Sequence, residues 1–193
     1  MNSQHFHVIT GASGAGKSSL LAALSALGHS TVPEVALAIL REQRAGNGRL
    51  LPGVDRAGFM EALLLRSIEA HRAAAALPAP VFFDRGVPEC VAWMRLMGLE
   101  AKSEHLEAAA RCRYAGTVFV AEPWPEIYVR DGEREASFER AARSFAPTVA
   151  AYVEAGYRIC ILPKVPVRER VAFVLAQLGG DACGFDSREP REA

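Results

Sequence analysis

Residues 11–18 of this chain read Gly11-Ala12-Ser13-Gly14-Ala15-Gly16-Lys17-Ser18. A glycine, four other residues, and then glycine, lysine and serine form a pattern typical of loops that hold phosphate groups. Glycine allows backbone turns that a Cβ would block, so successive N–H groups can point inward at phosphate oxygens. The stretch therefore predicts a phosphate-binding loop between a strand and a helix.

Two side chains at the end of this loop extend the prediction. Lys17 is expected to bridge the β- and γ-phosphates of a nucleoside triphosphate, and the Ser18 hydroxyl to coordinate Mg²⁺. ATP is expected rather than GTP, because the chain has no Asn-Lys-x-Asp motif that reads guanine. The residues expected to contact the nucleotide are Gly11, Ala12, Ser13, Gly14, Ala15, Gly16, Lys17, Ser18 and Ser19.

The same glycines also fit a second kind of nucleotide site. Residues 10–16 resemble the turn of dinucleotide-binding Rossmann folds, and Glu34 could be the acid that binds the ribose. That fold has no use for Lys17 followed by serine. No tyrosine of the chain is followed four residues later by lysine, as in short-chain dehydrogenases. The phosphate-loop interpretation is therefore preferred.

Short apolar segments alternate with helical segments along the chain. This alternation predicts a parallel sheet with helices on both faces. We expect one α/β domain over residues 1–178 and a poorly ordered polar tail over residues 179–193. A helix over 137–155 is expected to kink or break at Pro147. The five expected strands are 6–10, 30–32, 81–83, 117–120 and 157–162.

Composition and charge narrow the class of protein. The 22 basic and 22 acidic residues balance, so nucleic acid is not expected as the main partner. The N-terminus lacks a signal pattern, and no apolar stretch approaches the roughly 18 residues that span a bilayer. The widely spaced cysteines favour reduced thiols over a disulfide framework or a zinc site. We expect a soluble cytoplasmic protein, a monomer or small homo-oligomer, with no membrane partner.

Charged residues follow two of the expected strands, at the sheet edge where α/β proteins bind ligands. Asp84 could hold Mg²⁺, through water, or accept a proton from an attacking hydroxyl, and Arg85 could bind an anionic acceptor. Asp84 could instead only cap the following helix. Glu34 could bind the acceptor or act as a general base, but it could equally face solvent.

The segment 121–136 is charged, aromatic and poor in helix signals. In a phosphoryl-transfer enzyme, an arginine-bearing lid can neutralise the transferring group and exclude water. Arg134 is the preferred lid residue because it lies beside a glycine-containing turn. Arg140 and Arg143 are instead expected on a solvated helix face.

Further motifs accompany the loop in a fixed order: Val32-Pro33-Glu34, Phe82-Phe83-Asp84-Arg85-Gly86, Asp131-Gly132-Glu133-Arg134, and Pro163-x-x-Pro166-Val167-x-Glu169-Arg170. Together they resemble the small AAA-type ATPase and kinase domain family that includes the ribosylnicotinamide kinase domain of bacterial NAD-biosynthesis regulators. The resemblance covers about residues 6–178.

The resemblance implies a nucleoside-monophosphate-kinase-like fold, a three-layer α/β/α P-loop NTPase with strand order 2-3-1-4-5. It places Asp84 and Arg85 near the metal and the acceptor, the 131–134 motif in the lid, and residues 163–167 beside the base. Trp124, with Tyr128 nearby, is expected to offer an aromatic wall to a ring-bearing acceptor.

Two functions are compatible with these residues. The protein could be an ATP-dependent kinase of a small, nucleoside-like molecule, with Lys17, Asp84, Arg134 and Glu34 as catalytic residues. It could instead be a regulatory ATPase or GTPase switch that acts on a protein partner. A kinase predicts a closed acceptor pocket beside Glu34 and Arg85, whereas a switch predicts an exposed apolar patch and no second pocket. The lid-like arginines favour the kinase.

Overall fold

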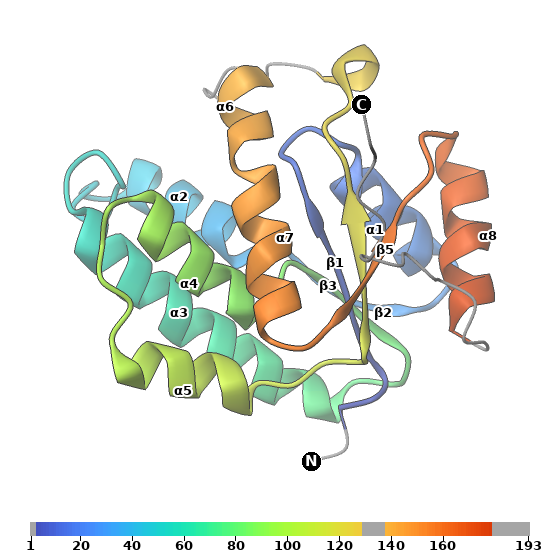
Figure 1. Cartoon of the computed structure of the whole chain (residues 1–193), viewed down its shortest axis with the longest axis horizontal. Helices are drawn as coiled ribbons and strands as arrows, with labels where there is room; N and C mark the ends of the chain where they lie inside the picture. The colour runs from blue at the N-terminus through green and yellow to red at the C-terminus, as the bar shows by residue number, and fades with distance from the viewer. Residues whose placement is uncertain (1–2, 129–137, 179–193) are drawn as a thin grey trace, which may run out of the picture.

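The structure, a computed structural model, describes residues 3–128 and 138–178 of the chain (Figure 1). The predicted tail, residues 179–193, lies outside this part. The strands are β1 (Phe6–Gly11), β2 (Ser30–Val32), β3 (Val81–Asp84), β4 (Thr117–Ala121) and β5 (Arg158–Ile161). The α-helices are α1 (Lys17–Ala26), α2 (Val35–Ala45), α3 (Arg56–Ala73), α4 (Val87–Leu96), α5 (Ser103–Arg111), α6 (Phe138–Arg143), α7 (Phe145–Glu154) and α8 (Val167–Gln177). Two short 3₁₀-helices, η1 (Ala74–Ala76) and η2 (Pro125–Ile127), follow α3 and β4.

The five strands form one parallel sheet in the order β2-β3-β1-β4-β5, which confirms the predicted fold class and topology. In the central ladder, Val8 of β1 lies between Phe83 of β3 and Val118 of β4. The carboxyl ends of parallel strands meet at one edge of the sheet, where ligands bind in α/β proteins. The segments that follow β1, β2 and β3 are therefore brought together there.

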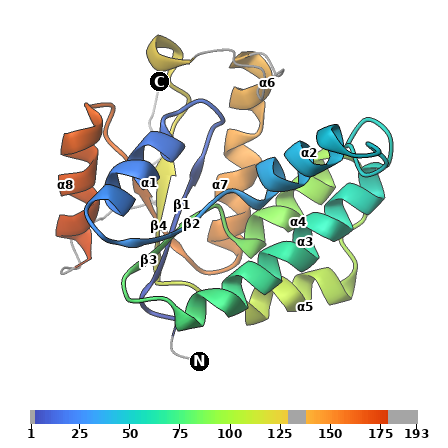
Figure 2. The ribbon, with the colours of Figure 1, turned by 180° about the vertical axis from the view of Figure 1, so that it is seen from behind.

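Side chains of the strands alternate between two apolar cores. Ile9 and Phe82 pack with residues of α1 and α8 on one face of the sheet. Val8 and Phe83 pack on the other face, where Tyr152 of α7 joins them. Figures 1 and 2 show α1 and α8 on one side of the sheet and α3, α4 and α7 on the other. Burial of both faces explains why the central strands are almost wholly apolar.

Helices α2, α3, α4 and α5 form a third apolar cluster with its own buried residues, among them Ile39, Phe59 and Val87. In Figure 2 these four helices lie together to one side of the sheet. Because α2 follows β2 and α4 follows β3, the cluster stands beside the carboxyl ends of those two strands. It supplies an outer wall for the site described below.

One helix prediction is wrong in its detail. The expected break in the 137–155 segment lies at Ser144, between α6 and α7, and not at Pro147. Pro147 falls in the first turn of α7, where a backbone N–H has no partner within the helix, so its missing donor costs nothing there.

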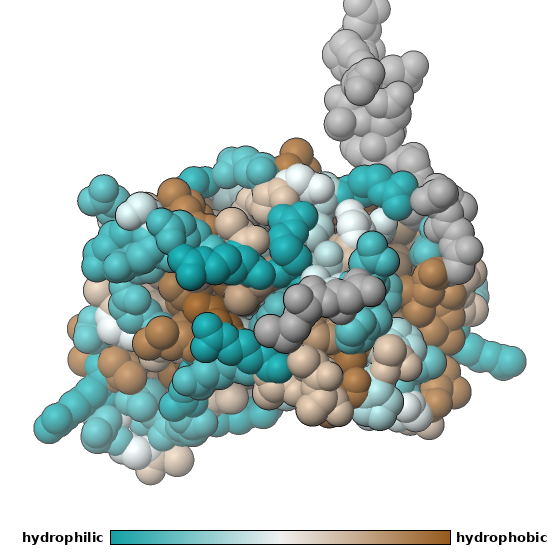
Figure 3. Space-filling view, turned by 90° about the horizontal axis from the view of Figure 1, so that it is seen from below, coloured by the Kyte–Doolittle hydropathy of each residue, from teal (hydrophilic) through white to brown (hydrophobic). Residues whose placement is uncertain are grey.

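The molecular surface, the lengths of the helices and the cysteines add three observations. On the face shown in Figure 3, hydrophobic side chains are interspersed with hydrophilic ones. Within residues 3–128 and 138–178, no helix is both long and apolar enough to cross a membrane. Cys90 and Cys112 are free and buried, whereas Cys160 is disulfide-bonded, which corrects the expectation that the thiols are all reduced.

Candidate functional site

The phosphate loop joins the end of β1 to the start of α1. The helix begins at Lys17 with Gly16 as its N-cap, so the N–H groups of its first turn point out of the helix end toward an anion. Gly11 has a φ of 114°, and a Cβ at this position would overlap the carbonyl oxygen of Ala121 in β4. Only glycine therefore allows the chain to turn out of the sheet so close to β4.

The Lys17 side chain folds back over the loop. It is 5% exposed, and its Nζ donates hydrogen bonds to the carbonyl oxygens of Ala12 at 2.7 Å and Gly11 at 3.3 Å. Burial lowers the pKa of Lys17 to about 8, and the nearby charge of Arg85 acts in the same direction. A phosphate group would offer this buried ammonium stronger, charged acceptors than the two carbonyls.

Residues after β4 and on α8 pack against the outside of the loop. The Tyr128 ring fills the space that a Cβ on Gly14 would need. Arg170 of α8 is 1% exposed and donates through Nη1 to the Ala15 carbonyl at 3.1 Å. Its guanidinium lies 5.9 Å from the centroid of the Trp124 ring. Helix α8 thus braces the backbone of the loop.

Asp84 ends β3 with a buried carboxylate, 5% exposed. Its Oδ1 makes no hydrogen bond to any residue in the described part of the chain. Burial raises the pKa of this carboxyl to about 6, opposed by the charge of Lys17. Gly86, not Asp84, is the N-cap of α4, so the capping interpretation does not hold. A buried carboxylate oxygen without a partner fits a role toward a hydrated cation such as Mg²⁺.

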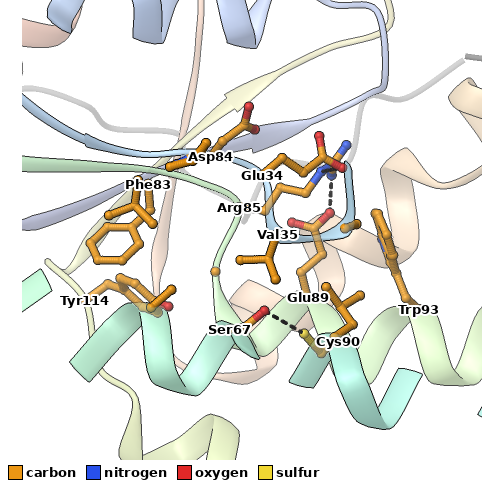
Figure 4. A pocket seen from close by; sticks show the side chains of 16 residues that line it. Glu34, Val35, Ser67, Phe83, Asp84, Arg85, Glu89, Cys90, Trp93 and Tyr114 are labelled. Carbon is orange, nitrogen blue, oxygen red and sulfur yellow. Dashed lines mark hydrogen bonds and ion pairs between the residues drawn. The ribbon is translucent and has the colours of Figure 1, made fainter. Parts of the chain in front are cut away.

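Arg85 is the centre of an ionic cluster at the ends of β2 and β3. Its backbone has a φ of 72°, which is uncommon for a residue other than glycine. The guanidinium pairs with Glu89 through Nη1 and with Glu34 through Nε at 3.1 Å (Figure 4). Its Cζ also lies 4.9 Å from the centroid of the Trp93 ring. Burial opposes its charge, but Glu34 and then Glu89 raise the pKa of Arg85 above its ordinary value.

Two hollows adjoin this cluster and share Glu34 and Asp84 as lining residues. The first, the apolar cavity, leaves only about 30 Å³ of free space beneath Arg85 and is walled by α3 and α4 (Figure 4). Its lining includes Val35, Leu63, Ser67, Phe83, Cys90, Trp93 and Tyr114. The second, the polar hollow, has about 300 Å³ and lies between α1, β2 and α2. Its lining includes Ser18, Ser25, Thr31 and Arg41.

The structure brings most of the predicted site residues together. Ser18 and Asp84 line the polar hollow, and Glu34 is held by Arg85 instead of lying free in solvent. Trp124 does not line the apolar cavity and lies against Arg170 after β4, so its expected contact with an acceptor stays a prediction. The aromatic wall of that cavity comes from Trp93 and Tyr114.

The three arginines predicted in or near the lid segment, Arg134, Arg140 and Arg143, do not share one outcome. Arg134 and the rest of the 131–134 motif lie outside the described residues, as does the side chain of Arg140. Arg143 is exposed at the end of α6, as expected for a solvated helix face.

Three buried or half-buried residues of the site were not predicted from the sequence. Glu89 lies four residues after Arg85, and this spacing on a helix could have identified it as a partner. Trp93 follows after one more helical turn on the same helix. Arg170 belongs to a motif used for the resemblance, but nothing in its neighbourhood in the sequence predicts contact with the loop.

Comparison with known proteins supports the fold described above. A family model described as an AAA domain matches residues 6–170. No curated protein matches the chain at a significant level. Among solved structures, a NadR protein in complex with NR superposes with a TM-score of 0.68 at 17% identity, over 91% of this chain. The chain spans only about half of that protein, 52% of its length.

Two similar structures are spanned almost completely. The deoxyadenosine kinase of M. mycoides, with products bound, has a TM-score of 0.62 at 14% identity, over 90% of this chain and 98% of its own. The shikimate kinase of Acinetobacter baumannii, in complex with shikimate, has a TM-score of 0.56 at 14% identity, over 93% and 95%. At these identities the likeness establishes a shared fold, that of P-loop kinases.

Proposed function

Because this chain belongs to the AAA domain family and has the fold of P-loop kinases, we propose that it is an ATP- and Mg²⁺-dependent kinase that phosphorylates a hydroxyl group of a small, nucleoside-like molecule. The observation that carries this proposal is the apolar cavity beside Glu34 and Arg85, next to the phosphate loop. A reaction that transfers a group between two substrates needs two adjoining binding sites. Here the nucleotide site and the second cavity adjoin at shared acidic residues.

On the nucleotide side, the loop residues 11–19 would hold the phosphates through backbone N–H groups. Lys17 would exchange its two carbonyl partners for phosphate oxygens. Ser18 would bind Mg²⁺ directly and Asp84 through water, since both line the polar hollow. Mg²⁺, when bound, offsets negative charge on the phosphates.

On the acceptor side, Glu34 is the best-placed general base. Its carboxylate lies at the boundary of the two hollows, and its contact with Arg85 Nε lacks hydrogen-bond geometry. It is therefore available to accept a proton from an acceptor hydroxyl. The ring of the acceptor would pack against Trp93 and Tyr114, after α3 and α4 separate enough to enlarge the narrow cavity.

The charge of the apolar cavity favours a hydroxyl acceptor over a phosphorylated one. Its charged lining residues are Glu34, Asp84, Glu89 and Arg85, three acids and one base. Arg85 is already paired with two of the acids. An acceptor phosphate would therefore meet a net negative charge with no unpaired cation in the lining of this cavity, which disfavours its binding.

The alternative function is a regulatory nucleotide switch that acts on a protein partner. That function requires an exposed surface whose contacts change with the bound nucleotide. It gives no reason for a buried ionic cluster and an aromatic cavity beside the phosphate loop. The kinase is therefore the preferred proposal.

A ligand screen by thermal unfolding tests the proposal. With a non-hydrolysable ATP analogue and Mg²⁺ present, we expect one or more free nucleosides to raise the melting temperature further, and the matching nucleoside monophosphates to do so less. Lys17→Met should remove the effect of the nucleotide. No added stabilisation by any nucleoside or other hydroxylated ring compound would count against the kinase and in favour of the switch.

A further inference from the structure

Glu89 is a buried acid to which the reaction proposed above assigns no role. It lies in the first turn of α4 and is 2% exposed. A carboxylate is seldom buried to this extent unless charged or polar groups surround it, because removal from water is costly. The partners of Glu89 therefore indicate why it is there.

Each oxygen of this carboxylate has a donor. Oε2 accepts a hydrogen bond of 2.5 Å from the Thr10 hydroxyl, at the end of β1, and lies 3.5 Å from the Tyr152 hydroxyl of α7. Oε1 pairs with Arg85 Nη1. Glu89 thus links Thr10 of β1, the strand before the phosphate loop, to Arg85, the residue after β3.

Arg85 is held in a conformation that it would not adopt without such support. A φ of 72° costs free energy in a residue with a Cβ, and such strain persists only where surrounding contacts over-determine it. The Glu89 pair has hydrogen-bond geometry, whereas Nε at 3.1 Å from Glu34 does not. The two acids therefore differ. Glu89 holds the guanidinium through a hydrogen-bonded ion pair, whereas Glu34 forms an ion pair with Nε without a hydrogen bond.

We propose that Glu89 is a positioning residue that holds Arg85 against Trp93, so that Glu34 can leave Arg85 for the acceptor hydroxyl. This inference rests on the proposed kinase function. If the Glu89 pair were lost, Arg85 would turn its full charge to Glu34, and the base would be drawn away from the acceptor.

The test is Glu89→Gln, which keeps the side-chain shape but removes the charge. With MgATP and the nucleoside selected by the ligand screen, kcat should fall about tenfold or more, since a small displacement of a reacting group is costly.

A matched control removes a carboxylate elsewhere. Glu61→Gln breaks the pair between Glu61 and His105 at 2.9 Å, on α3 and α5, away from both hollows. It should leave kcat unchanged. If Glu89→Gln does not fold, Thr10→Val serves in its place, because it removes only the hydroxyl that donates to Glu89 and so loosens the carboxylate that holds Arg85, and it should also lower kcat.

A second readout does not depend on catalysis. The chain has two tryptophans, so in a Trp124→Phe background the fluorescence reports Trp93 alone. Glu89→Gln should shift the Trp93 emission, because Arg85 leaves the ring, and Glu61→Gln should not. Unchanged Trp93 emission, or an unchanged kcat, would overturn the proposal. If no acceptor is ever phosphorylated but the emission shifts as expected, the kinase assignment fails while the contact between Glu89 and Arg85 stands.

Discussion

At the scale of single residues, the site is defined by charges that are buried before any ligand arrives. Lys17 has lost much of its water, and so has Asp84. Burial moves their pKa values toward each other, down to about 8 for Lys17 and up to about 6 for Asp84. Nucleotide binding in this protein should therefore be coupled to protons.

The coupling predicts a bell-shaped pH dependence of MgADP affinity, measured by calorimetry. Below pH 6, free Asp84 holds a proton that Mg²⁺ must displace, so affinity should fall by up to about tenfold per pH unit. Above pH 8, free Lys17 is neutral and must take up a proton to bind phosphate, so affinity should fall again. In Asp84→Asn the acid limb should disappear. An affinity that does not vary between pH 5 and pH 9 would contradict the assignment of both residues.

Lys17→Met gives a second prediction at this scale. The variant should stay folded, since methionine fills the same buried space without an ammonium that needs partners. It should lose the rise in melting temperature that the wild type shows with nucleotide, because the charge that contacts the phosphates is gone. Nucleotide stabilisation equal to that of the wild type would contradict the role of Lys17.

At the scale of elements, the phosphate loop is shaped by its neighbours as much as by its own sequence. The backbone of β4 lies so close to Gly11 that it leaves no room for a Cβ there. Arg170 of α8 donates a hydrogen bond to a carbonyl oxygen of the loop. Two pairs of substitutions separate these contacts from general effects.

Gly11→Ala and Gly28→Ala compare two glycines with positive φ, 114° and 89°. At Gly28 a Cβ meets open space, so the free energy of unfolding should fall by only about 1–2 kcal/mol, the cost of the left-handed backbone. At Gly11 the Cβ would overlap the Ala121 backbone, which cannot move without breaking the β1–β4 pairing. Denaturant unfolding should therefore show a clearly larger loss for Gly11→Ala, and similar losses would refute this close approach.

Arg170→Met and Arg168→Met compare a buried and an exposed arginine of α8. Loss of the hydrogen bond to the Ala15 carbonyl should loosen the loop and weaken MgADP binding about fivefold, equivalent to about 1 kcal/mol. The Arg168 variant should bind within about twofold of the wild type, as expected for a surface substitution. Equal affinities in the two variants would mean that α8 does not brace the loop.

At the scale of the whole molecule, the sequence predicts the sheet and the phosphate loop well, because both depend on local patterns. Apolar runs give the strands, and the glycine spacing gives the turn at Gly11. The acceptor side depends on how segments pack against one another. Although α4 follows β3 directly in the sequence, no local pattern predicts that Trp93 and Tyr114 line the same cavity, so neither was predicted as a lining residue.

The ionic cluster illustrates the same limit. Its members come from the ends of β2 and β3 and from α4, and only the fold shows that Arg85 is neutralised by Glu34 and Glu89 at once. From the sequence alone, Arg85 was a candidate for binding an anionic acceptor. Its pairing with two acids is the observation behind the proposed preference for an uncharged hydroxyl.

The proposed reaction transfers the γ-phosphoryl group of ATP to a hydroxyl of a second small molecule. The most direct measurement follows ATP labelled in its γ-phosphate and determines how the label divides between inorganic phosphate and an acceptor, over a panel of nucleosides and their monophosphates. We expect label in a nucleoside and not in its monophosphate, and loss of that product in Lys17→Met. Label that appears only as inorganic phosphate, at a rate no nucleoside changes, would contradict it.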